Sequence, residues 1–306
     1  MPVTNKLTIH QSDQLDYLCE LLLGFYRLRS HPFETFTLVV QTEGMKQFIS
    51  QYFSHRLGIV SNLNYQKISH FFWKTAQAFY PGLKQETDLY QQKIISWQLF
   101  NLFSSQDFKK HAPLAYQALY SYLKSHESSA YELALYLGKL FEEYLIYRPQ
   151  WIEIWDKNQQ VRELPEKIEQ WQRNLWYYLR RTFGENHRIY LWQKIKKKLL
   201  KNKLPSEVTL PKHIHFFAID HFPNFYLKLA NYLSLHTYVH LFCLNPCQEN
   251  WIDDNDTHPL LNMLGGERRD FFKILSEYNP SLEQKIFSDR QLKNSDILLH
   301  KIQQDI

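Results

Sequence analysis

The sequence predicts an α/β fold in which a parallel sheet is interrupted by an all-helical insertion. Four short β-type runs stand out along the chain: Leu7–His10, Thr37–Gln41, His213–Ile219 and Tyr238–Leu244. The last three are almost continuously apolar, as strands buried on both faces are. Helical patterns follow the first three runs, and strands that alternate with helices indicate βα units around a parallel sheet. Between Ser69 and Lys203 the strand signals fade and helical patterns follow one another.

The composition is that of a globular chain with room for two domains. Its 306 residues are 44% hydrophobic and 16% aromatic, which supports a large core. No apolar run approaches the ~18 residues of a membrane span, and the N-terminus does not have the pattern of a secretory signal. Cys19, Cys243 and Cys247 fit a reducing compartment better than a disulfide framework. The formal net charge of +5 permits nucleic acid as a partner without requiring it.

The opening segment Leu7–Phe25 has the strand–turn–helix order with which a P-loop nucleotide-binding domain begins. A P-loop needs glycines, so that backbone N–H groups can cradle phosphates, followed by Lys and Ser/Thr for the terminal phosphates and Mg²⁺. The turn Gln11-Ser12-Asp13 has neither glycine nor lysine, and the whole chain has only eight glycines. The segment is therefore either a nucleotide site that has been lost or a turn that never formed one.

The turn after the second run carries side chains that suit a nucleic acid. Gln41, Thr42, Glu43 and Gln47 surround it, and Gly44 is its flexible point. A helix N-terminus at this place offers N–H groups to a phosphate, and glutamine amides can bond base edges. The same pattern is also typical of a simple helix cap.

Two further features match ATPase motifs only in part. The Gly138-Lys139 pair lies inside an uninterrupted helical pattern and lacks a glycine five residues earlier. Asp220 ends an apolar strand, as a Walker B aspartate does, but His221 follows it in place of an acidic general base. A turn or capping role suits Asp220 better. We therefore expect no ATP hydrolysis by this segment alone.

The histidines and cysteines near the third and fourth runs do not predict a metal site. His240, Cys243 and Cys247 lack a fourth partner at a useful spacing, and a free cysteine in an apolar strand is commonly a small core residue. His213 and His215 alternate along one strand and therefore share a face. We interpret them as a pair of histidines at the end of the sheet.

The middle of the chain supplies the helices of the insertion. In the run YELALYLGKLFEEYLIY, apolar and aromatic residues recur at intervals of three and four: Leu133, Tyr136, Leu140, Tyr144 and Tyr147. Glu163–Phe183 and Ile189–Lys201 are also expected to be helices. We place the sheet domain at residues 1–68 and 207–306 and the helical insertion at residues 69–206.

A basic and aromatic segment lies in the second half of this insertion. Its cationic residues are Arg173, Arg180, Arg181, Arg188, Lys194, Lys196, Lys197, Lys198, Lys201 and Lys203, with six interleaved aromatic residues and one carboxylate, Glu185. Lysine and arginine neutralise phosphates, and aromatic rings can stack on unpaired bases. A solvated helix face, with Trp192, Ile195 and Leu199 as its buried stripe, explains the lysines equally well. In the nucleic-acid interpretation, the arginines Arg180, Arg181 and Arg188 make the contacts.

Several stretches of the chain together resemble one protein family. They are LVVQTEGMKQFISQYFSHRLGIVSNLNY, FFWKTAQ, FEEYLIYRPQWIEIW, LFCLNPCQENWIDD and NSDILLHKIQQDI. They resemble, in the same order, the N-terminal region of the RecC family, the gamma chain of exodeoxyribonuclease V in the bacterial RecBCD complex. The runs Tyr147–Trp151 and Asn245–Cys247 are the most specific. Family members are far longer, so we expect this chain to correspond to roughly the first quarter.

The resemblance implies the fold of a superfamily 1 helicase whose ATPase motifs are lost. Residues 1–68 and 207–306 then match subdomain 1A, and residues 69–206 match subdomain 1B. The implied role is to hold the 3′-ended single strand of forked DNA and scan it for the Chi sequence during double-strand break repair by recombination. RecB-like and RecD-like partners supply helicase and nuclease activity with ATP and Mg²⁺, so no cofactor is expected in this segment. The implied location is the bacterial cytoplasm.

The resemblance also implies the residues that contact DNA: Gln41, Glu43, Gln47, Lys67, Trp73, Leu140, Glu142, Arg148 and Arg188. Tryptophan can stack on a base, and arginine can pair with guanine edges or phosphates. Glu43, Lys67, Lys139 and Glu142 depart from the family pattern. A carboxylate at Glu43 repels phosphate and favours a cytosine amino group, so strand holding carries over better than the exact Chi sequence.

A different class of function is a docking scaffold for the RecB and RecD subunits with no DNA binding of its own. In that case the aromatic run Trp151–Trp155 is expected to anchor a protein interface.

Overall fold

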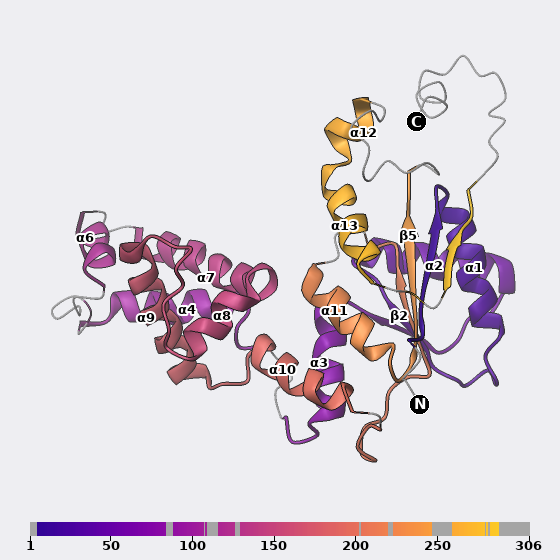
Figure 1. Cartoon of the computed structure of the whole chain (residues 1–306), viewed down its shortest axis with the longest axis horizontal. Helices are drawn as coiled ribbons and strands as arrows, with labels where there is room; N and C mark the ends of the chain where they lie inside the picture. Colours follow the sequence, from indigo (N-terminus) through magenta and orange to yellow (C-terminus); the bar gives the residue numbers. More distant parts are fainter. Residues whose placement is uncertain are drawn as a thin grey trace. The chain divides into compact units, whose positions relative to one another are not determined.

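The computed structural model describes residues 5–83, 88–106, 108, 116–125, 129–201, 203–219, 223–246, 259–278, 280 and 282–287. The chain divides into two compact units (Figure 1). We call residues 1–79 with 198–306 the sheet unit and residues 80–197 the helical unit. The helix Ile68–Phe79, which the sequence analysis placed in the insertion, is part of the sheet unit. The assignment of the two units to helicase subdomains stays a prediction.

The described residues of the sheet unit form six parallel strands in the order β3-β2-β4-β5-β1-β6, which confirms the predicted α/β fold with a parallel sheet. The strands are β1 (Leu7–Ser12), β2 (Phe36–Val39), β3 (Leu63–Gln66), β4 (His213–Phe217), β5 (Tyr238–Leu244) and β6 (Leu282–Lys285). Sequence analysis missed the edge strands β3 and β6, which lack a continuous apolar run because edge strands have fewer neighbours to bury them.

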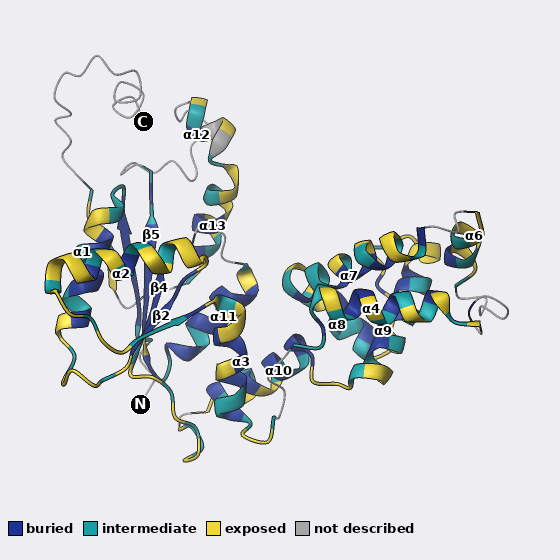
Figure 2. Ribbon diagram, turned by 180° about the vertical axis from the view of Figure 1, so that it is seen from behind, coloured by how far each residue is buried: buried dark blue, intermediate teal, exposed yellow. Residues whose placement is uncertain are grey.

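Helices cover both faces of this sheet (Figures 1 and 2). The connections from β1 to β2 and from β2 to β3 lead toward the β3 edge of the sheet. The connections from β3 to β4, from β4 to β5 and from β5 to β6 lead back toward the β6 edge. Because parallel crossovers are right-handed, the helices of the two directions lie on opposite faces. One face carries α1 (Leu15–Arg27) and α2 (Glu43–Leu57); the other carries α3 (Ile68–Phe79), α11 (Asn224–Leu233) and α13 (Gly266–Ser276), and α12 (Pro259–Leu264) precedes α13.

The core beneath α1 and α2 follows from the spacing of their apolar residues. Leu18 and Leu22, four positions apart on α1, are buried together with Phe53 of α2 against the sheet. Phe217 of β4 and Phe242 of β5 meet them from the strands. Cys19 in this core and Cys243 on β5 are buried, and neither forms a disulfide among the described residues, whereas Cys247, Asp220, His221 and Ile297–Ile306 lie outside the described residues.

The helical unit is a bundle whose helices are α4 (Gln92–Ser104), α6 (Gln117–Ser125), α7 (Ala130–Tyr147), α8 (Pro149–Asp156), α9 (Glu166–Phe183) and α10 (Arg188–Leu199), the last two residues of α10 belonging to the sheet unit. Gly138 lies inside α7, as predicted. A Cβ atom at this position would meet the backbone oxygen of Gln92 on α4 at 2.8 Å, so α4 and α7 pack closely because this residue is a glycine.

The aromatic run at α8 is part of the core of the helical unit. Pro149 opens α8, and the side chains of Trp151 and Trp155 are buried. The indole Nε1 of Trp155 donates to Glu169 at 2.9 Å, and that of Trp151 donates to Glu163 at 2.7 Å. The prediction that this run anchors a protein interface is therefore wrong, because its indoles are already used in internal packing. Among the described residues, no helix combines the length and apolarity that crossing a bilayer requires.

Candidate nucleic-acid interface

The connection between β1 and α1 stands where a phosphate loop would begin. β1 continues to Ser12 and α1 begins at Leu15, so only Asp13 and Gln14 separate them. The Ser12 hydroxyl accepts the backbone N–H of Gln14 at 3.1 Å. A phosphate cradle needs a longer loop with several free N–H groups. This connection is too short to form one.

Hydrogen bonds from side-chain amides link the carboxyl ends of β1 and β5. Asn245 donates from Nδ2 to Gln11 Oε1 at 2.8 Å, and its backbone N–H donates to the Ser12 carbonyl at 2.9 Å. Gln11 in turn donates to Glu283 of β6 at 2.5 Å. Three neighbouring strand ends are thus joined by protein groups at the edge of the sheet where ligands of open α/β sheets usually bind.

The carboxyl ends of β2 and β3 bring together the predicted residues of the sheet unit. The Glu43 carboxylate at the start of α2 lies 3.5 Å from the Lys67 ammonium, which follows β3, and 3.4 Å from the Lys46 ammonium. Gln41 and Gln47 are exposed beside them. Lys46 is a neighbour that the sequence analysis missed, although its spacing of three from Glu43 on a helix was the available signal.

The two lysines change the electrostatic effect of Glu43. The hydrogen bond and charge of Lys46, followed by those of Lys67, hold the pKa of Glu43 below its usual value. Together the three side chains carry one net positive charge. Thr42 caps α2 by accepting the Met45 N–H at 3.1 Å, and the positive end of the helix dipole lies here. The repulsion of phosphate expected from Glu43 is therefore offset by its neighbours.

Trp73 is placed differently from the residues around Glu43. It lies on α3 with 8% of its surface exposed, and its ring meets Phe72 edge-on with a centroid separation of 5.6 Å. Its indole Nε1 is buried and has no hydrogen-bond partner among the described residues. Stacking on a base requires an open ring face, so the contact between Trp73 and DNA stays a prediction.

The helical unit holds the other predicted residues, and Arg188 lies within its core. The Arg188 guanidinium donates to the Asp88 carboxylate at 3.0 Å, and both side chains are almost completely buried. Burial raises the pKa of Glu142 on α7, and the charge of Arg188 opposes that rise. These three residues therefore lie near one another. Sequence reasoning missed Asp88, because nothing in the sequence links a residue to a partner 100 positions away.

Leu140 and Arg148 occupy more open positions on the same unit. Leu140 is half-buried on α7, and Arg148 is exposed between α7 and α8. The Arg148 guanidinium lies 5.5 Å from the Trp151 ring centroid, which is cation–π distance. Of the predicted residues in the helical unit, Arg148 is the one with its charge available to a phosphate.

The basic segment contains arginines that are paired within the fold and other residues, mostly lysines, that face solvent. Arg180 contacts Asp156 and Glu185, and Arg173 contacts Glu169. The residues that remain exposed are Arg181, Lys194, Lys197, Lys201 and Lys203. The predicted buried stripe of Trp192, Ile195 and Leu199 is confirmed. The charges of Arg180 and Arg188 are paired within the fold, and their contact with DNA stays a prediction.

The fold and these sites define an α/β protein with an open parallel sheet, helices on both faces and no phosphate cradle in its first strand–helix connection. A sequence model of the RecC N-terminal domain matches residues 7–306. The chain therefore belongs to the RecC N-terminal domain family, and the family predicted from its motifs is confirmed.

Three proteins named RecBCD enzyme subunit RecC show the extent of the similarity. The protein from Escherichia coli is 29% identical over 277 residues, which cover 87% of this chain and 24% of that protein. The protein from Haemophilus influenzae is 27% identical over 308 residues, which cover 93% and 27%. The protein from Mycolicibacterium smegmatis is 25% identical over 326 residues, which cover 98% and 28%. The chain thus spans about a quarter of the length of these relatives.

Proposed function

We propose that this chain is the N-terminal part of a non-catalytic, RecC-like subunit that holds and channels the 3′-ended single strand for a RecBCD helicase–nuclease. The observation that carries the proposal is the family match across residues 7–306. The two-residue connection between β1 and α1 supports it, since a helicase-like core without a phosphate loop can guide DNA but cannot hydrolyse ATP. In this proposal the sheet unit corresponds to subdomain 1A and the helical unit to subdomain 1B.

The partners and setting of this function follow from the same proposal. RecB-like and RecD-like subunits bind ATP and Mg²⁺ and perform exodeoxyribonuclease V activity, whereas this segment uses no cofactor. The complex repairs double-strand breaks by recombination in the bacterial cytoplasm and responds to a Chi sequence. Gln41 and Gln47 present amides to base edges, and Lys67 and Arg148 present charge to the backbone, because all four side chains are exposed.

Lys67→Ala is expected to weaken single-strand binding about fivefold and to flatten its salt dependence. A variant that neutralises one phosphate fewer releases fewer counterions when it binds DNA. The slope of log K against log salt is therefore reduced by about 0.7 to 1. Fluorescence anisotropy of a labelled oligonucleotide at several salt concentrations measures both quantities. Arg148→Ala is expected to behave in the same way.

Lys74→Ala is the matched control, since Lys74 is an exposed lysine of α3 in the same unit as Lys67. We expect it to change neither affinity nor slope. Equal losses in Lys67→Ala and Lys74→Ala indicate attraction by overall charge and contradict a defined contact at Lys67. No measurable binding by the wild-type chain contradicts DNA holding by this segment.

The alternative function, docking of RecB-like and RecD-like subunits without DNA binding, is favoured by one exposed aromatic cluster. Trp97 is 57% exposed and Tyr131 is 43% exposed. The centroid of the Phe100 ring lies 5.9 Å from that of Trp97 and 5.7 Å from that of Tyr131, and the centroids of Trp97 and Tyr131 are 5.9 Å apart. Exposed aromatic clusters are typical anchors of protein interfaces. Capture of those subunits by the wild-type chain but not by Trp97→Ala, together with no retained DNA, supports the alternative.

A further inference from the structure

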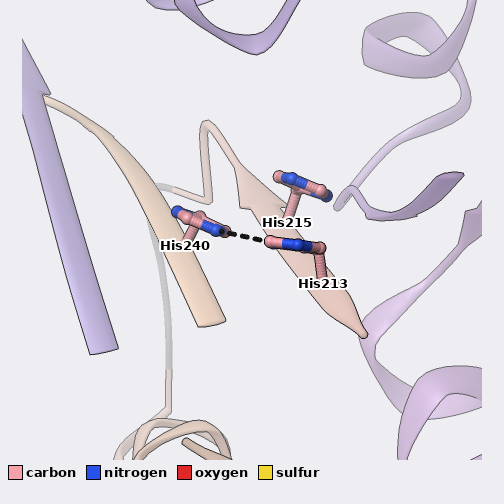
Figure 3. A group of neighbouring side chains, drawn as sticks. All are labelled: His213, His215 and His240. Carbon is pink, nitrogen blue, oxygen red and sulfur yellow. Dashed lines mark hydrogen bonds between the residues drawn. The ribbon is translucent and has the colours of Figure 1, made fainter. Parts of the chain in front are cut away.

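Histidines from neighbouring strands gather on the sheet face beneath α1. His213 and His215 point to this face from β4, and His240 of β5 is the register partner of His215. His10 of β1 continues the row next to His240, with 3.4 Å between the two rings' nearest nitrogens. Figure 3 shows His213, His215 and His240, with their rings side by side across the two strands. The sequence analysis found the first pair, but the position of His240 depends on strand register.

The hydrogen bonds assign a proton to one nitrogen of each inner ring. His215 Nδ1 lies 3.1 Å from the Thr37 carbonyl oxygen, which can only accept, so His215 carries its proton on Nδ1. His10 Nδ1 likewise donates to Gln284 Oε1 at 2.8 Å. His10 Nε2 is then an acceptor, and His240 donates to it from Nδ1. It follows that Nε2 carries the lone pair in both neutral His215 and neutral His240.

Within the described part of the chain, no hydrogen-bond donor reaches the lone pair of His215. Its Nε2 atom is buried, and no hydrogen-bond partner for it exists among the described residues, although the residue is only 1% exposed. Leaving a buried polar atom unpaired costs folding free energy. A Lewis acid that accepts this lone pair removes that cost.

The nitrogen positions suit one small cation. Ligand atoms of His213, His215 and His240 all lie within 4.8 Å of one another. His213 Nδ1 and His240 Nε2 are 3.3 Å apart, and two ligands of a tetrahedral Zn²⁺ are separated by about 3.3 Å because each Zn–N bond is about 2.0–2.1 Å. Binding through Nδ1 requires the proton of His213 to move to Nε2. The three rings are within 17° of parallel, so they must also turn toward a common point.

Two of the three histidines donate their second ring N–H to another group of the protein. A metal-binding histidine commonly donates its second ring N–H to a carbonyl oxygen or another acceptor, which fixes the tautomer and ring orientation. His215 does so to Thr37, and His240 does so to His10. Burial lowers the pKa of His240 to about 3 and also lowers the pKa values of His213 and His215.

A cavity gives access to this cluster. It has a volume of about 180 Å³, and its lining includes Phe25, Arg29, His213 and His215. The Glu34 carboxylate on its wall provides negative charge, while Arg29 and Lys212 provide positive charge. A water molecule in the cavity can supply the fourth ligand.

We propose that His213, His215 and His240 bind one divalent transition-metal ion, with Zn²⁺ as the ion that best suits three imidazoles and a water. The ion joins β4 to β5 on the face covered by α1. Its role is structural: it stabilises the sheet unit and leaves the surface around Glu43 unchanged. The proposal does not depend on DNA binding.

Calorimetric titration of the chelator-treated 306-residue chain with Zn²⁺ tests the site. The expected result is one ion per chain with a micromolar or lower Kd, weakened at least tenfold in His213→Ala and in His240→Ala. His55→Ala is the matched control, since His55 is an exposed histidine of α2, and it is expected to bind as the wild type does. Co²⁺ in place of Zn²⁺ is expected to give the intense visible absorption of a four-coordinate complex.

A thermal measurement keeps the test decisive if a variant folds poorly. Zn²⁺ is expected to raise the melting temperature of the wild-type chain and of His55→Ala, and to leave that of His213→Ala unchanged. His213 is half-buried at the start of β4, so its loss is the mildest of the three. Absence of stoichiometric binding by the wild type, or the same affinity in His213→Ala, overturns the proposal.

Discussion

Gly138→Val is expected to destabilise the helical unit by about 3 kcal/mol, because a side chain at this position collides with α4. A Cβ atom on Gly138 would lie 2.8 Å from the Gln92 carbonyl oxygen and 3.0 Å from the Ser96 backbone nitrogen. These are backbone atoms of a helix, so they move only if α4 and α7 separate along their contact. Urea denaturation followed by circular dichroism measures the loss.

Gly24→Ala is the control with the opposite sign. Gly24 lies in the last turn of α1, and a Cβ atom there meets nothing within 4 Å. Alanine in a helix is more favourable than glycine by about 0.5–1 kcal/mol, so this variant is expected to be more stable than the wild type. Gly138→Ala as stable as the wild type contradicts the close packing of α4 and α7.

The central strands could be predicted from the sequence, whereas the edge strands β3 and β6 could not. β4 (HIHFF) and β5 (YVHLFCL) are rich in apolar and aromatic residues because both of their faces are covered by helices. β3 reads LNYQ and β6 reads LEQK, and such short polar runs are typical of loops as well as of edge strands. Their pairing with β2 and β1 is a long-range contact, which no local pattern reports.

For the candidate sites, too, the sequence predicts local features but not contacts between distant segments. The turn at Gln41 and Glu43 could be found from its local pattern, because cap, helix and polar residues adjoin in the sequence. The pairing of Glu43 with Lys67 depends on β2 and β3 lying side by side, and His240 joins His215 only through the register of β4 and β5. Burial of Trp151 and Trp155 likewise follows from how α8 packs against its neighbours.

The basic segment illustrates why counting charges overestimates a nucleic-acid surface. The planar guanidinium of arginine forms several directed hydrogen bonds and is less strongly hydrated than an ammonium, so arginine suits internal ion pairs. Arg173, Arg180 and Arg188 are used in this way, while Lys194 and Lys197 remain in solvent. The sequence shows the same positive charge for all of these residues, but only the exposed ones, which are Arg181 and several lysines, leave charge at the surface.

Arg188→Ala is expected to cost about 3–5 kcal/mol of stability, because it leaves the buried Asp88 carboxylate without its cation. The side chains of Arg188 and Asp88 are only 5% and 10% exposed, and their charged atoms are 3.0 Å apart. Asp88→Ala is expected to cost a similar amount for the complementary reason. Urea denaturation of both single variants checks this, and losses below about 1 kcal/mol contradict a buried pair.

The double variant Arg188→Met/Asp88→Leu separates stability from DNA contact. Replacing both members of a buried ion pair by apolar residues removes the unpaired charge, so its stability is expected to recover toward that of the wild type. If Arg188 acts only within the fold, this double variant binds single-stranded DNA as the wild type does in the anisotropy assay. If it is folded but binds DNA less tightly, the guanidinium contacts the strand as the family resemblance implies. The buried pair with Asp88 favours the first result, because the Arg188 guanidinium is almost completely buried inside the helical unit and its charge is already paired with a carboxylate.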